Sequence, residues 1–210
     1  MSTAGEPYLQ PYLRAAQRHG AEFPSLLWAS PRTQRARFEA IRQAYDPAGR
    51  SVLDAGCGRA DYLSFLLERG VAPADYIGIE AVSDLADAAE ARHPQATIIR
   101  ADFVREPARM FVGAEVVVFS GSLNTLEGPA FFETVRRAYD AAGEALVFNF
   151  LSSSILAGQV YLFWHSPQDV LRFARGICAD VRLRQDYLAG DCTACLVKPD
   201  APGTKETVHG

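Results

Sequence analysis

The stretch SVLDAGCGRAD, residues 51–61, decides the fold of this chain. An apolar run ends at Asp54, and Gly56 and Gly58 follow, where the backbone can turn tightly and pass close to a ligand. Apolar residues then return at helical spacing from Tyr62 onward. The stretch therefore predicts a strand, a glycine turn and a helix start. A strand that ends in such a turn and continues into a helix is expected to place free backbone N–H groups at the helix N-terminus, at the carboxyl edge of a parallel sheet, which predicts a ligand site.

Strand and helix signals alternate along the rest of the chain. Upstream, the pattern predicts an amphipathic helix over residues 7–18 and a second helix that begins at Ser30-Pro31. Downstream, it predicts strands over 75–80, 96–101, 114–119 and 144–150, and helices over 84–92, 129–141 and 166–177. The last two strands, 181–187 and 192–198, are too close for a crossover helix and should form an antiparallel hairpin.

This order of elements predicts a doubly wound, Rossmann-like α/β fold. We expect a seven-stranded sheet, mostly parallel with an antiparallel C-terminal hairpin, in a three-layer α/β/α sandwich. With 210 residues, the chain has the length of a single domain. We divide it into an N-terminal helical cap or lid over 1–50, a Rossmann-like domain over 51–198 and a disordered tail over 199–210.

Composition and charge exclude several classes of function. The hydrophobic share of 49% and the charged share of 22% are typical of a soluble globular protein. No apolar run reaches membrane-spanning length and the N-terminus lacks the pattern of a signal peptide, so we expect a cytoplasmic protein without membrane contact. The net charge of −4 disfavours a nucleic-acid partner.

The pair Cys192 and Cys195 forms a C-x-x-C motif that could be redox-active or bind a metal. The motif lies in a predicted strand, where residues three apart point to opposite faces of the sheet. Zinc needs about four ligands, and the chain has no second pair of this kind. We therefore expect two small core residues and no metal site.

Acids stand where three successive strands are predicted to end. Asp54 ends the first strand, Glu80 the second, and Asp102-Phe103 follows the third. An acid at the second strand end can accept hydrogen bonds from the ribose hydroxyls of a nucleoside. An acid after the third can accept from the adenine amine, while the neighbouring aromatic ring stacks on the base.

The motif VLDAGCG at 52–58, together with the strand-end acids and the open strand end at Ser120, resembles the class I S-adenosylmethionine-dependent methyltransferase family. The likeness covers most of residues 28–198, and several shorter segments are similar to a small, poorly characterised bacterial branch of the family. The resemblance implies S-adenosylmethionine as the cofactor and S-adenosylhomocysteine as its product. The cofactor-binding residues that it implies are Trp28, Arg37, Asp54, Gly56, Cys57, Gly58, Glu80, Ala81, Asp102, Phe103, Ser120 and Gly121.

The resemblance also implies a role for each part of this set. Asp54 would stand near the ammonium group of the cofactor, Glu80 would hold the ribose, and Asp102 with Phe103 would take the adenine. Arg37, on a helix that folds over the site, is the candidate for the cofactor carboxylate. Ala60 stands where the family often has a third glycine, which costs little if the backbone there is helical.

The expected reaction is methyl transfer by in-line displacement, in which a general base is optional. The candidate catalytic residues are His165, Tyr161 and Asp186. The supply of aromatic and apolar residues around the expected mouth favours a small-molecule acceptor, and the oligomeric state stays open. One alternative is a non-catalytic module that retains the cofactor. Another is an NAD-dependent oxidoreductase, which Asp61 disfavours because an acid at that position would repel a pyrophosphate.

Overall fold

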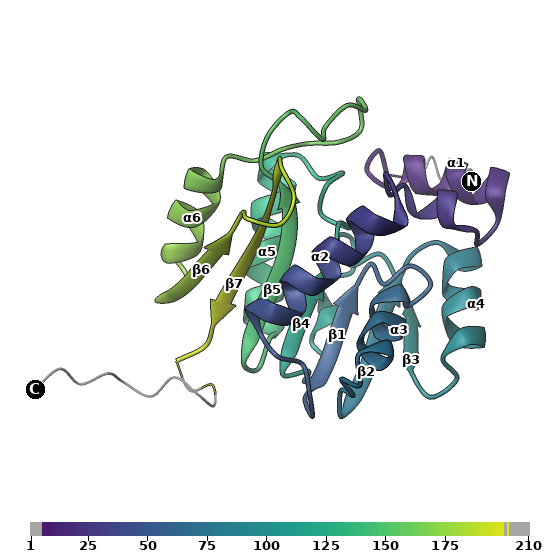
Figure 1. The fold of residues 1–210 in the computed structure, drawn as a ribbon, viewed down its shortest axis with the longest axis horizontal. Helices are drawn as coiled ribbons and strands as arrows, with labels where there is room; N and C mark the ends of the chain where they lie inside the picture. The colour runs from purple at the N-terminus through teal and green to yellow at the C-terminus, as the bar shows by residue number, and fades with distance from the viewer. Residues whose placement is uncertain (1–5, 200, 202–210) are drawn as a thin grey trace, which may run out of the picture.

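The structure, a computed structural model, describes residues 6–199 and residue 201. A seven-stranded sheet with the order β3-β2-β1-β4-β5-β7-β6 forms its centre (Figure 1). The strands are β1 (Ser51–Ala55), β2 (Asp75–Glu80), β3 (Thr97–Arg100), β4 (Val116–Phe119), β5 (Ala145–Leu151), β6 (Asp180–Arg184) and β7 (Asp191–Val197). The helices are α1 (Gln10–His19), α2 (Pro31–Ala44), α3 (Asp61–Glu68), α4 (Ser83–Arg92), α5 (Gly128–Ala141) and α6 (Pro167–Arg175), with short 3₁₀ turns η1 (Phe23–Leu26) and η2 (Pro107–Met110).

The strand pairing confirms the predicted fold class. Strands β1 to β5 run parallel to one another, and β7 pairs antiparallel with both β5 and β6. The stretch over residues 51–61 lies at the centre of the sheet, because β1 pairs with β2 on one side and with β4 on the other. The carboxyl ends of the first four strands consequently meet at one edge of the sheet.

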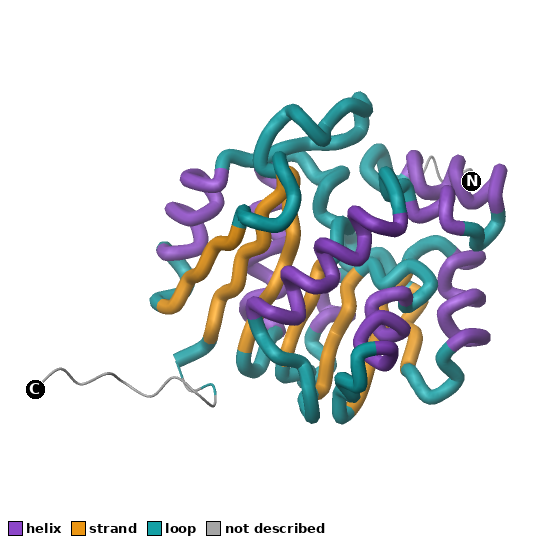
Figure 2. The backbone as a smooth tube through the Cα atoms, in the orientation of Figure 1, coloured by secondary structure: helices purple, strands orange, loops and turns teal. Residues whose placement is uncertain are grey.

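Alternate residues of the strands feed two separate hydrophobic cores. Val52 packs with Phe38 of α2 and Phe65 of α3 on one face, and Ala89 of α4 joins the same cluster. Figure 2 shows α2 running across this face of the sheet. Leu53, the next residue of β1, points into the cluster on the opposite face. The alternation is that expected of a strand covered on both sides, which confirms the three-layer sandwich.

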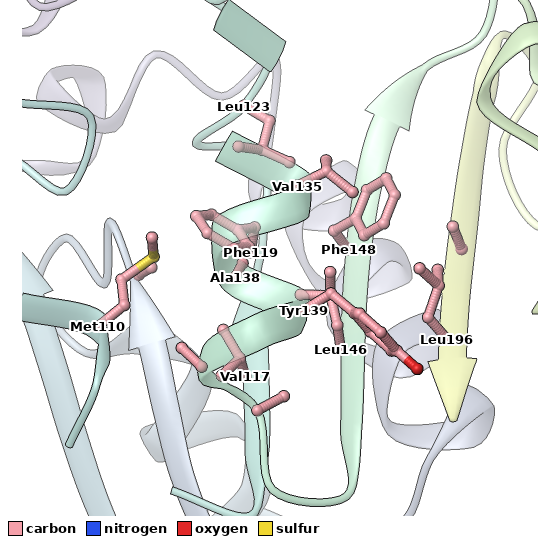
Figure 3. Close-up of a cluster of buried hydrophobic side chains, with 14 of the residues drawn as sticks. Met110, Val117, Phe119, Leu123, Val135, Ala138, Tyr139, Leu146, Phe148 and Leu196 are labelled. Atoms are coloured by element: carbon pink, nitrogen blue, oxygen red, sulfur yellow. The ribbon is translucent and has the colours of Figure 1, made fainter. Parts of the chain in front are cut away.

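The opposite core lies between the sheet and α5, α6 and η2. Figure 3 shows Val135 and Ala138 of α5 facing the side chains of Phe119 and Phe148 from the strands. Met110 of η2 fills the same layer with no exposed surface. This tight packing holds β4 and β5 rigidly, so the loops that follow them start from well-defined positions.

The cysteine pair follows the predicted alternation. Cys192 belongs to the cluster on the α5 side, and Cys195 to the cluster on the α2 side. Both are buried, and both thiols are free. The expectation that they point to opposite faces as small core residues is therefore confirmed.

The N-terminal residues are divided between two positions. α2 packs against β5 and β7 as one helix of the sandwich, whereas α1 and η1 lie together beyond the edge where the parallel strands end (Figure 1). Of the predicted disordered tail, only Pro199 and Ala201 fall within the described residues, and Ala201 is buried in the α2-side cluster. Among the described helices, none is long and apolar enough to cross a membrane.

Candidate functional site

A cavity lies at the edge where β1 to β5 end, covered by α1, η1 and the start of α2. All twelve residues that the family resemblance implied for the cofactor line it. They come from four strand ends and two N-terminal segments, which are brought together only by the fold. The site is therefore built where a doubly wound sheet is expected to bind its ligand.

Asp54 presents a buried carboxylate to this cavity. Its Oδ2 accepts a hydrogen bond of 2.5 Å from the Tyr76 hydroxyl, and the residue is only 2% exposed. Its Oδ1 is buried and has no hydrogen-bond partner among the described residues. Burial raises the pKa of Asp54 to about 7, and the nearby charge of Asp61 adds to the shift. An unpartnered buried oxygen is costly unless a ligand satisfies it.

Glu80 closes β2 and connects it to the glycine turn. Its Oε2 accepts from the Gly58 amide at 2.9 Å, and its Oε1 accepts from the Val82 amide at 2.8 Å. A carboxylate has about four lone-pair positions, so further acceptor capacity remains for a ligand. Burial raises the pKa of Glu80 to about 7, and Asp54 contributes to the increase.

The amides of four residues in the turn are used within the chain. The N–H groups of Gly56 and Cys57 donate to the Ile79 carbonyl at 2.8 and 3.0 Å, and that of Ala60 donates to the Cys57 carbonyl at 2.9 Å. Gly58 donates to Glu80, as described above. The Ile79 carbonyl and the Glu80 carboxylate, both in β2, thus accept from the amides of Gly56, Cys57 and Gly58. These four amides are therefore not available to an anion, and the turn presents carboxylates to a ligand.

The glycines of the turn are required by geometry. Gly56 has φ +78°, and a Cβ atom built there would lie 2.4 Å from the Cβ of Ser122. Gly58 has φ +57°, and its Cβ would approach Leu26 of η1 to 2.8 Å. Ala60, which could have been helical, instead has φ +55° and ψ +39° in the left-handed region. The third position of the turn thus keeps the backbone conformation that glycine adopts most easily.

Asp102 and Phe103 form the part of the cavity after β3. The Tyr8 hydroxyl donates to Asp102 Oδ2 at 2.7 Å, and the Val104 amide donates to Oδ1 at 3.0 Å. The Phe103 ring stands edge-on to Phe119, with 5.3 Å between ring centroids. Burial and the hydrogen bond to Asp102 raise the pKa of Tyr8 well above its usual value. Tyr8 therefore remains a donor that ties the N-terminal segment to this strand end.

Trp28 and Arg37 form the wall near the end of β4. Gly121 has φ +76°, and a Cβ atom there would lie 2.8 Å from the Trp28 ring. The Arg37 guanidinium carbon lies 5.0 Å from the centroid of the Trp28 ring, in a cation–π contact. Arg37 Nε donates to Asp191 Oδ2 at 2.6 Å. Ser120, the first residue after β4, donates weakly to Asn149 at 3.4 Å.

The three predicted catalytic residues do not line this cavity. His165 stacks on the Phe131 ring at 3.9 Å between centroids, its Nε2 lies 3.3 Å from the Leu126 carbonyl, and burial lowers its pKa. Asp186 is exposed and accepts a hydrogen bond of 2.6 Å from Arg184. Tyr161 is partly exposed, on the loop after β5. The prediction of these three residues depended on residue type alone, because the sequence does not show whether their side chains point toward the cavity.

The sequence did not indicate Tyr8 as a site residue, whereas Tyr12 belongs to the aromatic residues expected around the mouth; both line the cavity. They are four residues apart, in the segment predicted as an amphipathic helix. Burial raises the pKa of Tyr12 well above its usual value, and the negative charge of Glu80 adds to the shift. Within the described part of the chain, no group of three or more His, Cys, Asp or Glu side chains could hold a metal ion.

Several solved structures with the same architecture are methyltransferases. Magnesium protoporphyrin IX methyltransferase from Synechocystis PCC 6803, with bound S-adenosylmethionine, has a TM-score of 0.67 at 12% identity, covering 94% of this chain and all of that one. DhpI in complex with S-adenosylhomocysteine has a TM-score of 0.65 at 17% identity, covering 93% and 96%. The small RNA methyltransferase HEN1 has a TM-score of 0.66 at 12% identity, covering 83% of this chain and 26% of that one.

These matches show that the chain has the class I S-adenosylmethionine-dependent methyltransferase fold. No protein-family model matches the sequence. No curated protein sequence matches it significantly.

Proposed function

We propose that this chain binds S-adenosylmethionine and transfers its methyl group to a small-molecule acceptor. The observation that carries the proposal is that Asp54, Glu80 and Asp102 line one cavity, and that the Oδ1 atom of Asp54 is buried with no hydrogen-bond partner among the described residues. Three acids from adjacent strand ends suit a ligand with an ammonium group, ribose hydroxyls and an adenine amine. A ligand of this kind would satisfy the buried oxygen and remove the cost of leaving it unpaired.

The residues present fit each part of this cofactor. Asp54 would accept from the ammonium group, and the remaining lone pairs of Glu80 would accept from the ribose hydroxyls. Asp102 would accept from the adenine amine beside the Phe103 ring, and Arg37 would donate to the carboxylate. When bound, the cofactor supplies an activated methyl group on a sulfonium.

A dinucleotide fits the same cavity poorly. A pyrophosphate needs free amides at the turn, and those of Gly56, Cys57 and Gly58 are already used within the chain. Asp61 argues less strongly against a pyrophosphate than the sequence indicated, because Arg59 and Arg92 both form ion pairs with it. The stronger argument against a pyrophosphate is that the Glu80 carboxylate already accepts a hydrogen bond from the Gly58 amide.

The lining of the cavity favours a small, partly apolar acceptor. Leu151, Leu156, Leu162 and Leu188 line it beside the cofactor residues. Among the described lining residues, Arg37 is the only basic one, and it is paired with an acid. An RNA acceptor would require basic residues for its phosphates, so the likeness to HEN1 is not matched by the electrostatics here.

The proposed chemistry requires alignment more than acid or base catalysis. Asp54, Glu80 and Arg37 would hold the cofactor, whose sulfonium would supply the methyl group to a lone pair of the acceptor. The carbon–sulfur electron pair would remain on S-adenosylhomocysteine, and any proton of the attacking atom would pass to solvent with the product. α1 and η1 cover the cavity and would limit the access of water to the reacting atoms.

A second candidate is a module that binds the cofactor without transferring its methyl group. It is favoured by the position of His165, Tyr161 and Asp186 outside the cavity lining. The two functions are separated by incubating the protein with methyl-labelled S-adenosylmethionine and a panel of small phenols, amines, thiols and carboxylic acids. Labelled product that depends on Asp54 supports the enzyme. Tight cofactor binding with no transfer to any acceptor supports the binding module.

A further inference from the structure

We infer that Asp191, the first residue of β7, is a positioning residue of the cofactor site, acting through Arg37. Asp191 holds the Arg37 guanidinium so that its free edge faces the carboxylate of the cofactor. The inference rests on the proposed function. It extends the cofactor site to the antiparallel hairpin, which contributes none of the cofactor-binding residues that the family resemblance implied.

Arg37 and Asp191 form a buried ion pair between segments 154 residues apart. Arg37 Nε donates to Asp191 Oδ2 at 2.6 Å, and Arg37 Nη2 binds the same oxygen. The side chains are 8% and 0% exposed. Two nitrogens bound to one carboxylate restrict both the position and the rotation of the planar guanidinium.

Asp191 is itself held by a chain of polar side chains. Its Oδ1 accepts from the Tyr187 hydroxyl, which in turn accepts from Thr193 Oγ1 at 2.8 Å. Asn149 Nδ2 of β5 donates to Thr193 Oγ1 at 2.6 Å. Both carboxylate oxygens are therefore held within the chain, and Asp191 does not line the cavity. This leaves Arg37 as the member of the network that lines it.

Arg37 retains donors for a ligand. A guanidinium has five N–H donors, and Asp191 uses two of them. Nη1 makes no hydrogen bond with any residue that the structure describes, and Arg37 lines the cavity. A fork of unused donors on a fixed plane matches the geometry of a carboxylate.

The same ion pair sets the position of a cavity wall. The Arg37 guanidinium lies over the Trp28 ring at 5.0 Å, and that ring occupies the space where a side chain at Gly121 would be. An arginine released from Asp191 would lose this stacking. The amino-acid end of the cofactor would then face a mobile Arg37 side chain and a less firmly held Trp28 ring.

The test compares two ligands that differ at the amino-acid end. S-adenosylhomocysteine carries the carboxylate, and 5′-methylthioadenosine lacks the whole amino-acid part. We expect Asp191→Asn to weaken the binding of S-adenosylhomocysteine about tenfold or more, as for the loss of a hydrogen bond to a charged group, and that of 5′-methylthioadenosine less than about twofold. The exposed Asp169→Asn serves as the control, with no expected change for either ligand.

A second variant removes the guanidinium together with its acid, and it serves if Asp191→Asn does not fold. Replacing a buried ion pair by apolar residues of similar size often preserves the fold, so Arg37→Met with Asp191→Leu tests whether the paired guanidinium binds the carboxylate. We expect this double variant to keep its affinity for 5′-methylthioadenosine and to lose that for S-adenosylhomocysteine. Equal losses for both ligands, or unchanged affinity for S-adenosylhomocysteine, would overturn the inference. Wild-type protein that binds neither ligand would instead overturn the proposed function on which it rests.

Discussion

The Oε2 atom of Glu80 accepts a hydrogen bond of 2.9 Å from the backbone amide of Gly58, so the acid at the end of β2 is tied to the glycine turn after β1. This one contact changes what the turn can bind. An amide that could have received an anion is used by a carboxylate, and the carboxylate itself faces the cavity. The turn in this chain is consequently suited to hydroxyl, amine and ammonium groups.

Glu80→Gln tests this relationship directly. The glutamine keeps the size of the side chain, but its NH₂ group would face either the Gly58 amide or the Val82 amide, each of which needs an acceptor. We expect S-adenosylhomocysteine to bind more weakly by about 1.5–3 kcal/mol, tenfold or more, in calorimetric titration. Glu133→Gln, on the exposed face of α5, is the matched control. Unchanged affinity in Glu80→Gln would remove this residue from the site.

The stability of the ligand-free protein should fall as the pH rises toward neutrality. Asp54 and Glu80 each have a pKa of about 7 in the folded state, against ordinary values near 4 in the unfolded chain. Between these values the folded state binds more protons, so the free energy of unfolding decreases with increasing pH. The contribution is complete below about pH 4 and is lost through about pH 7. Urea unfolding of the wild type and of Asp54→Asn between pH 5 and 8 measures this contribution. If the free energy of unfolding changed with pH equally in the two proteins, the prediction would be contradicted.

The affinity for the cofactor should change in the opposite direction. The proposed contacts need both carboxylates charged, so binding below pH 7 must remove protons from them. We expect the dissociation constant of S-adenosylhomocysteine to rise by up to about tenfold for each pH unit and each group below pH 7. At pH 6 the binding enthalpy should depend on the ionisation enthalpy of the buffer, because protons are released. Affinity that is constant from pH 5.5 to 8 would show that neither acid contacts the ligand.

Gly56→Ala should destabilise the fold more than Gly70→Ala. Both glycines have positive φ, +78° and +69°, so both substitutions introduce backbone strain of about 1–2 kcal/mol. A methyl group at Gly70 meets open space, whereas one at Gly56 lies 2.4 Å from the Cβ of Ser122. The comparison therefore isolates the close approach. We expect the free energy of unfolding to fall by at least about 2 kcal/mol more for Gly56→Ala, and equal losses would show that Ser122 moves away freely.

His165→Ala should affect stability without affecting the cofactor. The ring stacks on Phe131 and its Nε2 lies within reach of the Leu126 carbonyl, so its removal costs packing and a hydrogen bond, about 1–3 kcal/mol together. The affinity for S-adenosylhomocysteine should change by less than about twofold, because the residue does not line the cavity. A variant with wild-type stability and no methyl transfer would restore His165 as a catalytic candidate.

The arrangement of elements and the strand-end residues could be predicted from the sequence. Alternation of apolar strands and amphipathic helices determines a parallel sheet, and such a sheet brings Asp54, Glu80 and Asp102 to one edge whatever the details of packing. The C-terminal hairpin followed from spacing alone. These predictions needed only periodicity and chain length, which local sequence contains.

The hydrogen-bond partners within the site could not be predicted in the same way. That Glu80 uses the Gly58 amide depends on a side-chain rotamer and on the relative height of two strands. Asp191 lies in a stretch that reads as an ordinary edge hairpin, and only the crossing of α2 over β7 brings Arg37 to it. Likewise, nothing near His165 in the chain shows that its ring turns toward Phe131.

The most direct test of the cofactor site is a calorimetric titration of the purified protein with S-adenosylhomocysteine at pH 7.5, beside an identical titration with NAD. We expect saturable binding of one S-adenosylhomocysteine per chain, weakened about tenfold or more by Asp54→Asn, and no saturable binding of NAD. Binding of NAD without binding of S-adenosylhomocysteine, or S-adenosylhomocysteine binding that is indifferent to Asp54, would contradict the assignment of this cavity.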